Sequence, residues 1–137
     1  MKNSRTRSLI CATALAFAAL TGCADEKDGP VKNLTAKEIA AELKKDGGDK
    51  IVILDVRTPG EFADGHLAGA ENIDFSADGF EEKVGKLDRD KTYVVHCRSG
   101  NRSGRSMKVF KELKFKSILH MSDGFLGWQE AGEKIEK

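Results

Sequence analysis

The feature of the sequence best suited to chemistry is a cysteine followed at once by cations. Cys97 ends the apolar run "TYVVH", and Arg98, Arg102 and Arg105 follow it closely. The thiolate is the nucleophilic form of cysteine, and neighbouring cations and helix N-termini lower the pKa of the thiol. This segment therefore predicts a reactive cysteine. The alternative is a buried, inert cysteine beside an exposed basic helix start.

The residues after the cysteine are also of types that bind a small anion. Gly100 and Gly104 can let the backbone curl so that successive N–H groups point inward as an anion nest. The helix that follows presents its positive end to the same place. We expect this pocket to stabilise a thiolate and to attract a small dianion. The predicted binding residues are Arg98, Ser99, Gly100, Asn101, Arg102 and Ser103.

Cysteine usage narrows the chemistry further. The chain has three cysteines, of which Cys11 and Cys23 lie in an N-terminal segment that has the pattern of an export signal. Cys97 is then left without a disulfide partner inside the mature domain. A zinc site needs about four ligands, and the spacing of the Cys and His residues offers no such set. We therefore expect no metal site.

The first residues are typical of an export signal. Residues 1–8 are basic, and residues 9–20 form an apolar run that is too short to span a bilayer, which needs about 20 apolar residues. The run ends in "LTGC", which resembles the lipobox of bacterial lipoproteins. This resemblance implies removal of residues 1–22 and lipidation of Cys23. The alternatives are a plain secretory cleavage near Ala24 and a buried N-terminal helix.

Downstream of the predicted cleavage site the composition changes twice. Residues 23–32 are polar and contain Gly29-Pro30, which predicts a flexible tether, and residues 33–137 are left as the folded domain. We expect an exported protein, anchored by lipid on the periplasmic side of a bacterial membrane. Ala24 rather than Asp follows Cys23, which slightly favours the outer membrane.

Length and charge limit the other possibilities. A chain of 137 residues suits one domain, and its 39% hydrophobic residues can make one core. The formal net charge is +1, so the composition gives no reason to propose nucleic acid as a partner. We expect a monomer.

The elements that must position the cysteine alternate between strands and helices. Residues 35–45 have a capping box and one apolar face, which predicts a helix that Gly47-Gly48 ends. The apolar runs at 51–54 and 92–96 predict strands buried on both faces. Further strands are expected near 70–75 and 116–123. Further helices are expected from Pro59, from Gly79, after Cys97 and over 124–132.

This alternation predicts an α/β domain, a parallel sheet with helices on both faces. In such domains the functional site lies at the carboxyl ends of the strands. Cys97 follows a predicted buried strand directly and precedes a predicted helix. The cysteine is therefore expected at the edge of the sheet where a site would form.

Spacing separates two enzyme families that use such a loop. Protein tyrosine phosphatases have five residues between the cysteine and an arginine, whereas here the arginine falls one position short. "CRSGNR" instead resembles the active-site loop of rhodanese-type sulfurtransferases. This loop is one residue shorter than that of the phosphatases, and the smaller pocket that it forms fits a persulfide rather than a phosphate. "LDVRTPGEFADGHLAGAENI" at 54–73 and "DGFLGW" at 123–128 resemble other rhodanese motifs, although Phe125 replaces a more usual glycine.

The resemblance implies a small rhodanese-like α/β fold and a sulfur transfer in two steps. Thiosulfate, or a similar anionic sulfane donor, would load Cys97 with a persulfide, and cyanide or a thiol would then accept the sulfur. No cofactor is implied. The alternatives are a persulfide carrier or binding module with little turnover, and a phosphatase or arsenate reductase that uses the same anion loop.

Several other polar residues are assigned supporting or structural roles. Asp55 is expected either to orient Arg102 and the loop or to cap a turn, and Arg57 is expected to pair with Glu61. His66 is expected to be a hydrogen-bonded structural residue. His96 points away from Cys97 if both lie on a strand. Simple packing roles are predicted for His120 and Trp128.

Overall fold

The computed structural model describes residues 29–47 and 49–137, and its centre is a five-stranded parallel sheet. The predicted signal segment 1–22 and Cys23 lie outside the described residues. In spatial order the strands are β1 (Val31–Leu34), β6 (Ser117–Met121), β5 (Thr92–His96), β2 (Ile51–Asp55) and β4 (Glu71–Asn72). Within residues 29–47 and 49–137, no helix has the length and apolar character needed to cross a membrane.

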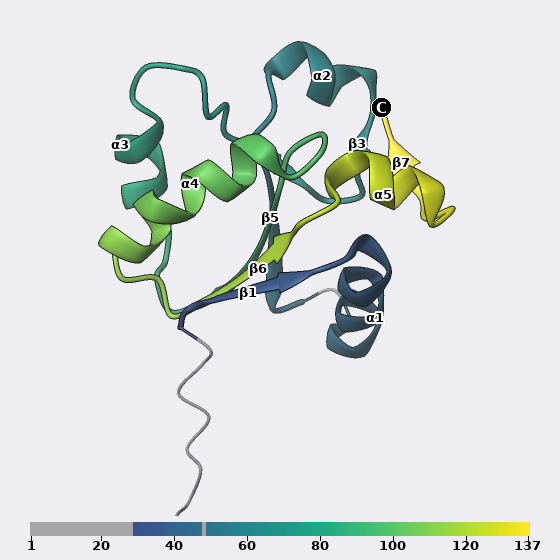
Figure 1. Cartoon of the computed structure of the whole chain (residues 1–137), viewed down its shortest axis with the longest axis horizontal. Helices are drawn as coiled ribbons and strands as arrows, with labels where there is room; N and C mark the ends of the chain where they lie inside the picture. Colours follow the sequence, from purple (N-terminus) through teal and green to yellow (C-terminus); the bar gives the residue numbers. More distant parts are fainter. Residues whose placement is uncertain (1–28, 48) are drawn as a thin grey trace, which may run out of the picture.

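Helices cover both faces of this sheet, as the α/β prediction requires (Figure 1). One face packs against α1 (Ala36–Asp46) and α5 (Gly124–Glu130), and the other against α3 (Phe80–Gly85) and α4 (Asn101–Glu112). The short helix α2 (Pro59–Asp64) follows β2 and has no buried residue. The predicted fold class is therefore confirmed.

The central strands explain why their apolar runs are unbroken. Ile53 and Val94 belong to the core on the α1 side, while their neighbours Leu54 and Val95 belong to the core on the α4 side. Successive side chains of a strand point to opposite faces, so a strand covered on both faces needs apolar residues at every position.

Two capping boxes set where helices begin near the sheet. Thr35 accepts a hydrogen bond from the backbone N–H of Glu38, and the Glu38 carboxylate accepts one in return, which confirms the predicted start of α1. Thr58 and Glu61 form the same arrangement at α2, with Pro59 as its first residue.

Three short strands differ from the sequence expectation. Residues 31 and 32 were predicted as part of the tether, but they belong to β1, in which Val31 lies opposite Ile118 of β6. Strands β3 (His66–Leu67) and β7 (Ile135–Glu136) form an antiparallel pair that was not predicted. These strands lack a long apolar run, and pairing with distant segments stabilises them instead.

The loop after β5 is held by the first turn of α5. The backbone N–H groups of Phe125 and Leu126 donate hydrogen bonds to the carbonyl oxygens of Cys97 and Arg98, at 2.8 and 3.0 Å. The carbonyl and N–H of a trans peptide point in opposite directions. When both carbonyls face α5, the N–H groups of Arg98 and Ser99 are turned away from that helix. The loop therefore presents donors on its inner side.

Two glycines make this close approach possible. Gly100 has a φ of +90°, and a Cβ there would collide with the carbonyl oxygen of Ser122. Gly124 has a φ of +63°, and a Cβ there would lie 2.5 Å from the carbonyl oxygen of Arg98. Gly104, which was predicted to help curl the loop, lies inside α4 instead.

Replacing Gly100 with Ala should therefore distort the loop and destabilise the domain. A side chain at this φ is strained and also meets backbone, so we expect a loss of at least about 2 kcal/mol in the free energy of unfolding. Chemical denaturation measures it. Gly85→Ala is the matched control, because nothing lies within 4 Å of the added Cβ. Equal stability of the two variants would contradict this account of the loop.

Candidate active site

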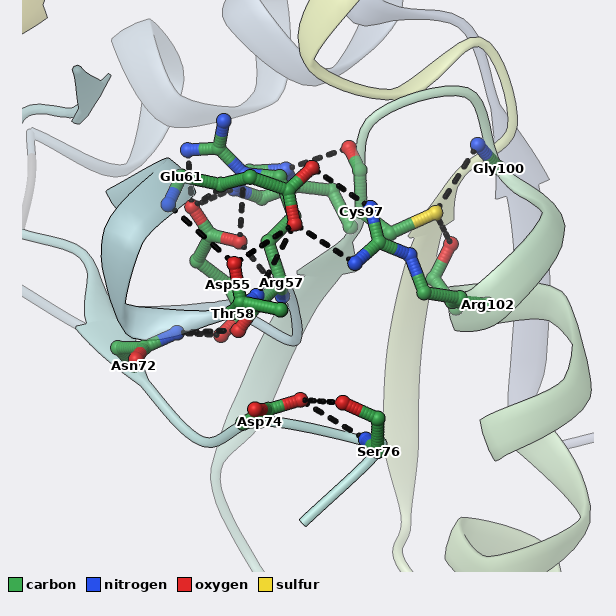
Figure 2. A network of polar contacts seen from close by, with 12 residues as sticks. Asp55, Arg57, Thr58, Glu61, Asn72, Asp74, Ser76, Cys97, Gly100 and Arg102 are labelled. Carbon is green, nitrogen blue, oxygen red and sulfur yellow. Dashed lines mark hydrogen bonds and ion pairs between the residues drawn. The ribbon is translucent and has the colours of Figure 1, made fainter. Parts of the chain in front are cut away.

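The sulfur of Cys97 lies at the carboxyl end of β5 and is almost enclosed. The residue is 1% exposed. The Gly100 backbone N–H donates to its Sγ at 3.2 Å, and the Ser103 hydroxyl lies 3.4 Å from the same atom. Figure 2 shows the sulfur facing this part of the loop. Donors thus converge on the sulfur from the loop and from the first turn of α4.

These donors favour the thiolate. Burial alone raises the pKa of the Cys97 thiol, because it disfavours the charged form. The Ser103 hydroxyl and the nearby backbone N–H groups outweigh burial, so the pKa lies below its ordinary value. These N–H groups belong to Ser103, Ser99 and Gly100. Hydrogen bonds to the charged form are therefore the means by which this site activates its cysteine.

Five of the six predicted binding residues divide into two groups. Ser99, Gly100 and Ser103 contribute donors to the sulfur. The side chains of Arg98 and Asn101 are exposed on the loop and at the start of α4, and Arg98 borders a hollow of about 280 Å³. This hollow is also lined by Arg57, Glu61 and Phe125.

Arg102 is bound by a carboxylate from α2. Its Nη1 and Nη2 donate to the two carboxylate oxygens of Glu61 at 2.7 and 2.8 Å, and both side chains are partly buried (Figure 2). This contact with Arg102 holds the pKa of Glu61 at about 2. The hydrogen bond to Glu61 raises the pKa of Arg102, and the nearby Cys97 charge adds to this effect. Arg102 thus links α2 to the cysteine loop, with its charge partly offset by Glu61.

The predicted pairing of Arg57 with Glu61 is wrong. Arg57 lies before the first residue of α2, so the helical spacing that would bring it beside Glu61 does not apply. Its Nε instead donates to both carboxylate oxygens of Asp55 at 2.9 Å. Arg57 is 3% exposed, and its guanidinium lies 4.1 Å from the centre of the Phe125 ring.

Asp55 has the second of its two predicted roles, because its Oδ1 accepts a hydrogen bond from the backbone N–H of Arg57 at 3.0 Å and so caps the turn before Thr58. It is fully buried at the end of β2, where its carboxylate binds Arg57 rather than Arg102 or the cysteine loop. Arg57 also donates to the carbonyl oxygen of Gly65 at 2.7 Å. The amide of Asn72 on β4 donates to the backbone carbonyls of Asp55 and Arg57 (Figure 2). This buried pair fixes the chain beside the hollow.

Two of the histidines lie as predicted. His66 Nδ1 is 2.9 Å from the carbonyl oxygen of Phe62, and the two rings stack, which confirms a hydrogen-bonded structural residue. His96 is fully buried and stacks near Phe125, on the opposite face of the sheet from Cys97. Burial lowers the pKa of His96. Trp128 is also buried, and its indole N–H donates to a backbone carbonyl.

His120 does more than pack, which the sequence analysis missed. Its Nε2 lies 2.8 Å from the Ser103 hydroxyl and its Nδ1 2.7 Å from Oδ1 of Asn33. One signal lay in the spacing: strand alternation puts His120 on the same face as Ile118, and the structure places Ile118 in the core on the Cys97 side. Asn33 could not be anticipated, because it lies on β1, which was not predicted.

The arrangement suits a nucleophilic thiolate that binds a small anion. Backbone N–H groups, a hydroxyl and the nearby Arg102 surround one sulfur atom. Within residues 29–47 and 49–137, no cluster of three or more His, Cys, Asp or Glu side chains is arranged to hold a metal ion. The nucleophile of this arrangement is the sulfur of Cys97.

Comparison with known proteins agrees with this geometry. The chain is 34% identical to a probable adenylyltransferase/sulfurtransferase MoeZ of Mycobacterium tuberculosis over 69% of its own length, and spans only 24% of that protein. It is 30% identical to a thiosulfate sulfurtransferase GlpE of Pseudomonas aeruginosa, over 69% of this chain and 81% of that one.

A solved structure and a family model extend the comparison. The crystal structure of a rhodanese-related protein from Thermoplasma volcanium matches with a TM-score of 0.66 and 30% identity, over 77% of this chain and 97% of the other. The family model of the rhodanese-like domain matches residues 35–131. These residues include the cysteine loop and the helices α1 to α5. The chain therefore belongs to the family of rhodanese-like domains, among relatives named as sulfurtransferases.

Proposed function

We propose that this protein is a sulfurtransferase that takes the outer sulfur of thiosulfate, or of a similar anionic donor, onto Cys97. The observation that carries the proposal is the ring of donors around a buried sulfur whose pKa is lowered. A relative of similar length that bears the name thiosulfate sulfurtransferase supports the choice of donor.

The reaction proceeds by two displacements at sulfur. The Cys97 thiolate attacks the outer sulfur of thiosulfate, the S–S bond of thiosulfate breaks, and sulfite leaves with the bonding electron pair. The product is a persulfide on Cys97. Cyanide or a thiolate then attacks the outer sulfur of that persulfide, and the Cys97 thiolate is released again. Electrons and atoms balance without a cofactor.

The loop has a defined part in each displacement. Its N–H groups and the Ser103 hydroxyl stabilise negative charge on sulfur, first on the thiolate and then on the persulfide. Arg102 supplies a positive charge near the sulfur, and Arg98 lies at the exposed rim. Both positive charges lie at the mouth of a small pocket, where they attract an anionic donor.

We further propose that the protein is exported and anchored by lipid at Cys23 outside the cytoplasmic membrane. The basic segment, the short apolar run and the lipobox-like "LTGC" support this location. The polar tether predicted at 23–32 would keep the domain close to the membrane surface, with the outer membrane slightly favoured.

The assay for the proposed activity is formation of thiocyanate from thiosulfate and cyanide. The full-length chain should turn over, and Cys97→Ser should reduce the rate to background because a hydroxyl cannot carry the sulfane sulfur. Circular dichroism should show that the variant keeps its fold. A variant that retains most of the activity would exclude the Cys97 mechanism. A wild-type chain that loads sulfur but makes little thiocyanate would instead be a persulfide carrier.

Replacing Arg102 with Ala should weaken donor binding more than chemistry. Loss of one charged contact predicts a KM for thiosulfate that is about tenfold higher, with a smaller change in kcat. Arg105→Ala is the matched control, because Arg105 is an arginine of the same helix that lies beside the Phe75 ring. An unchanged KM in Arg102→Ala would show that this arginine serves only to bind Glu61.

Glu61→Gln separates the charge of Arg102 from its structural contact. The amide keeps a hydrogen-bond acceptor for the guanidinium but removes the negative charge. The KM for thiosulfate should fall in this variant and rise in Arg102→Ala. A KM that rises in both variants would indicate that the contact between α2 and α4 matters, and that the charge does not.

A further inference from the structure

A chain of hydrogen bonds leads from the reactive sulfur into the interior. The Ser103 hydroxyl lies 3.4 Å from Sγ of Cys97 and 2.8 Å from Nε2 of His120. The other ring nitrogen of His120 lies 2.7 Å from Oδ1 of Asn33. Ser103 is fully buried and His120 is 6% exposed. Cys97 directly follows β5 and the other three residues come from α4, β6 and β1, so the fold brings them together from distant segments.

The Ser103 hydroxyl has a single proton, so this series of hydrogen bonds has two possible arrangements. A hydroxyl donates one hydrogen bond, so Ser103 can donate either to the sulfur of Cys97 or to Nε2 of His120. Oδ1 of Asn33 only accepts, so Nδ1 of His120 carries a proton. A neutral His120 then has a bare Nε2, which takes the hydroxyl proton and leaves an oxygen lone pair facing the thiol.

The opposite arrangement follows when His120 is protonated. Both ring nitrogens are then donors, Nε2 donates to the Ser103 oxygen, and the hydroxyl proton must turn towards the sulfur. That direction stabilises a thiolate on Cys97. The state of His120 and the state of Cys97 are therefore coupled through one hydroxyl.

We propose that His120 takes up, through the Ser103 hydroxyl, the proton that Cys97 releases. The S–H bond breaks, its electron pair stays on sulfur, and the proton passes to the Ser103 oxygen. The original hydroxyl proton passes to Nε2 of His120. No electron is transferred and the total charge is unchanged. His120 is thus a positioning residue, with Asn33 setting which nitrogen is free to receive the proton.

The environment of His120 favours a neutral imidazole ring as long as Cys97 is a thiol. Burial lowers the pKa of His120, while the Gly100 backbone raises it, so an isolated charge on the ring is disfavoured. A negative sulfur across one hydroxyl compensates for that charge. The groups that contact the ring in the described part of the chain are the side chains of Asn33 and Ser103 and the backbone of Gly100, and none of them titrates.

The charged side chains near the sulfur belong to an ion pair outside this hydrogen-bond chain. Arg102 of α4 lies near Cys97, with Glu61 of α2 as its partner. Both keep their charges at neutral pH, because the pKa of Glu61 is about 2 and that of Arg102 is raised. The proposed proton transfer therefore involves Cys97 and His120 and leaves the charges of Arg102 and Glu61 unchanged.

The test compares thiolate absorbance with proton release in the full-length chain. In weakly buffered solution near neutral pH, ultraviolet absorbance reports the Cys97 thiolate, and iodoacetamide then alkylates it. A thiolate that has lost its proton to solvent releases none on alkylation, whereas a thiolate paired with protonated His120 releases one. Subtracting Cys97→Ser removes the contribution of the other two cysteines.

The expected result is a thiolate signal together with release of about one proton for each Cys97 alkylated. In His120→Gln the amide can donate to Ser103 but cannot take up a proton. The number of protons released for each Cys97 alkylated should therefore fall below one, by the fraction of Cys97 that is thiolate. A wild-type thiolate that releases no proton would overturn the proposal, and this outcome needs no variant at His120 to fold.

The pH profile of alkylation gives a second readout. His120→Phe should raise the apparent pKa of Cys97 by about one unit. The rate of alkylation should then be about tenfold lower at mildly acidic pH and unchanged at alkaline pH. His66→Phe is the control, since His66 contacts Phe62 outside this chain. An unchanged profile in His120→Phe would also overturn the proposal. The inference builds on the proposed role of Cys97, but alkylation uses no sulfur donor, so the two can fail separately.

Discussion

The site depends on one backbone interaction, the binding of the carbonyl oxygens of Cys97 and Arg98 by the first N–H groups of α5. It turns the loop so that its own N–H groups face inward, and it requires glycine at 100 and 124 because the two segments touch. The donors of the loop outweigh the effect of burial on the pKa of Cys97. A loop without this support would leave a buried cysteine in its thiol form.

Two ion pairs hold the remaining wall of the site and act differently. Asp55 and Arg57 are buried, and each would leave an uncompensated charge in the interior if the other were lost. Glu61 and Arg102 are partly exposed, so water can replace part of their contact. Because an anionic donor can compete with Glu61 for Arg102, this second pair suits a surface that changes partners when substrate binds.

Local patterns predicted the parts of the fold that depend on local interactions. The capping box at Thr35 and the unbroken apolar runs of β2 and β5 follow from hydrogen bonding and burial within short segments. Strand β1 has no such pattern and depends on pairing with β6. For the same reason the sequence indicated the cysteine loop but not the Asn33–His120–Ser103 chain, and it assigned Arg57 to the wrong carboxylate.

The central claim is that Cys97 carries a sulfur atom, and intact mass spectrometry tests it most directly. The full-length chain is weighed before and after thiosulfate, and again after cyanide, with Cys97→Ser treated in parallel. The account predicts a gain of one sulfur atom that cyanide removes and that the variant lacks. An unchanged mass in the wild-type chain, or an equal gain in Cys97→Ser, would contradict it.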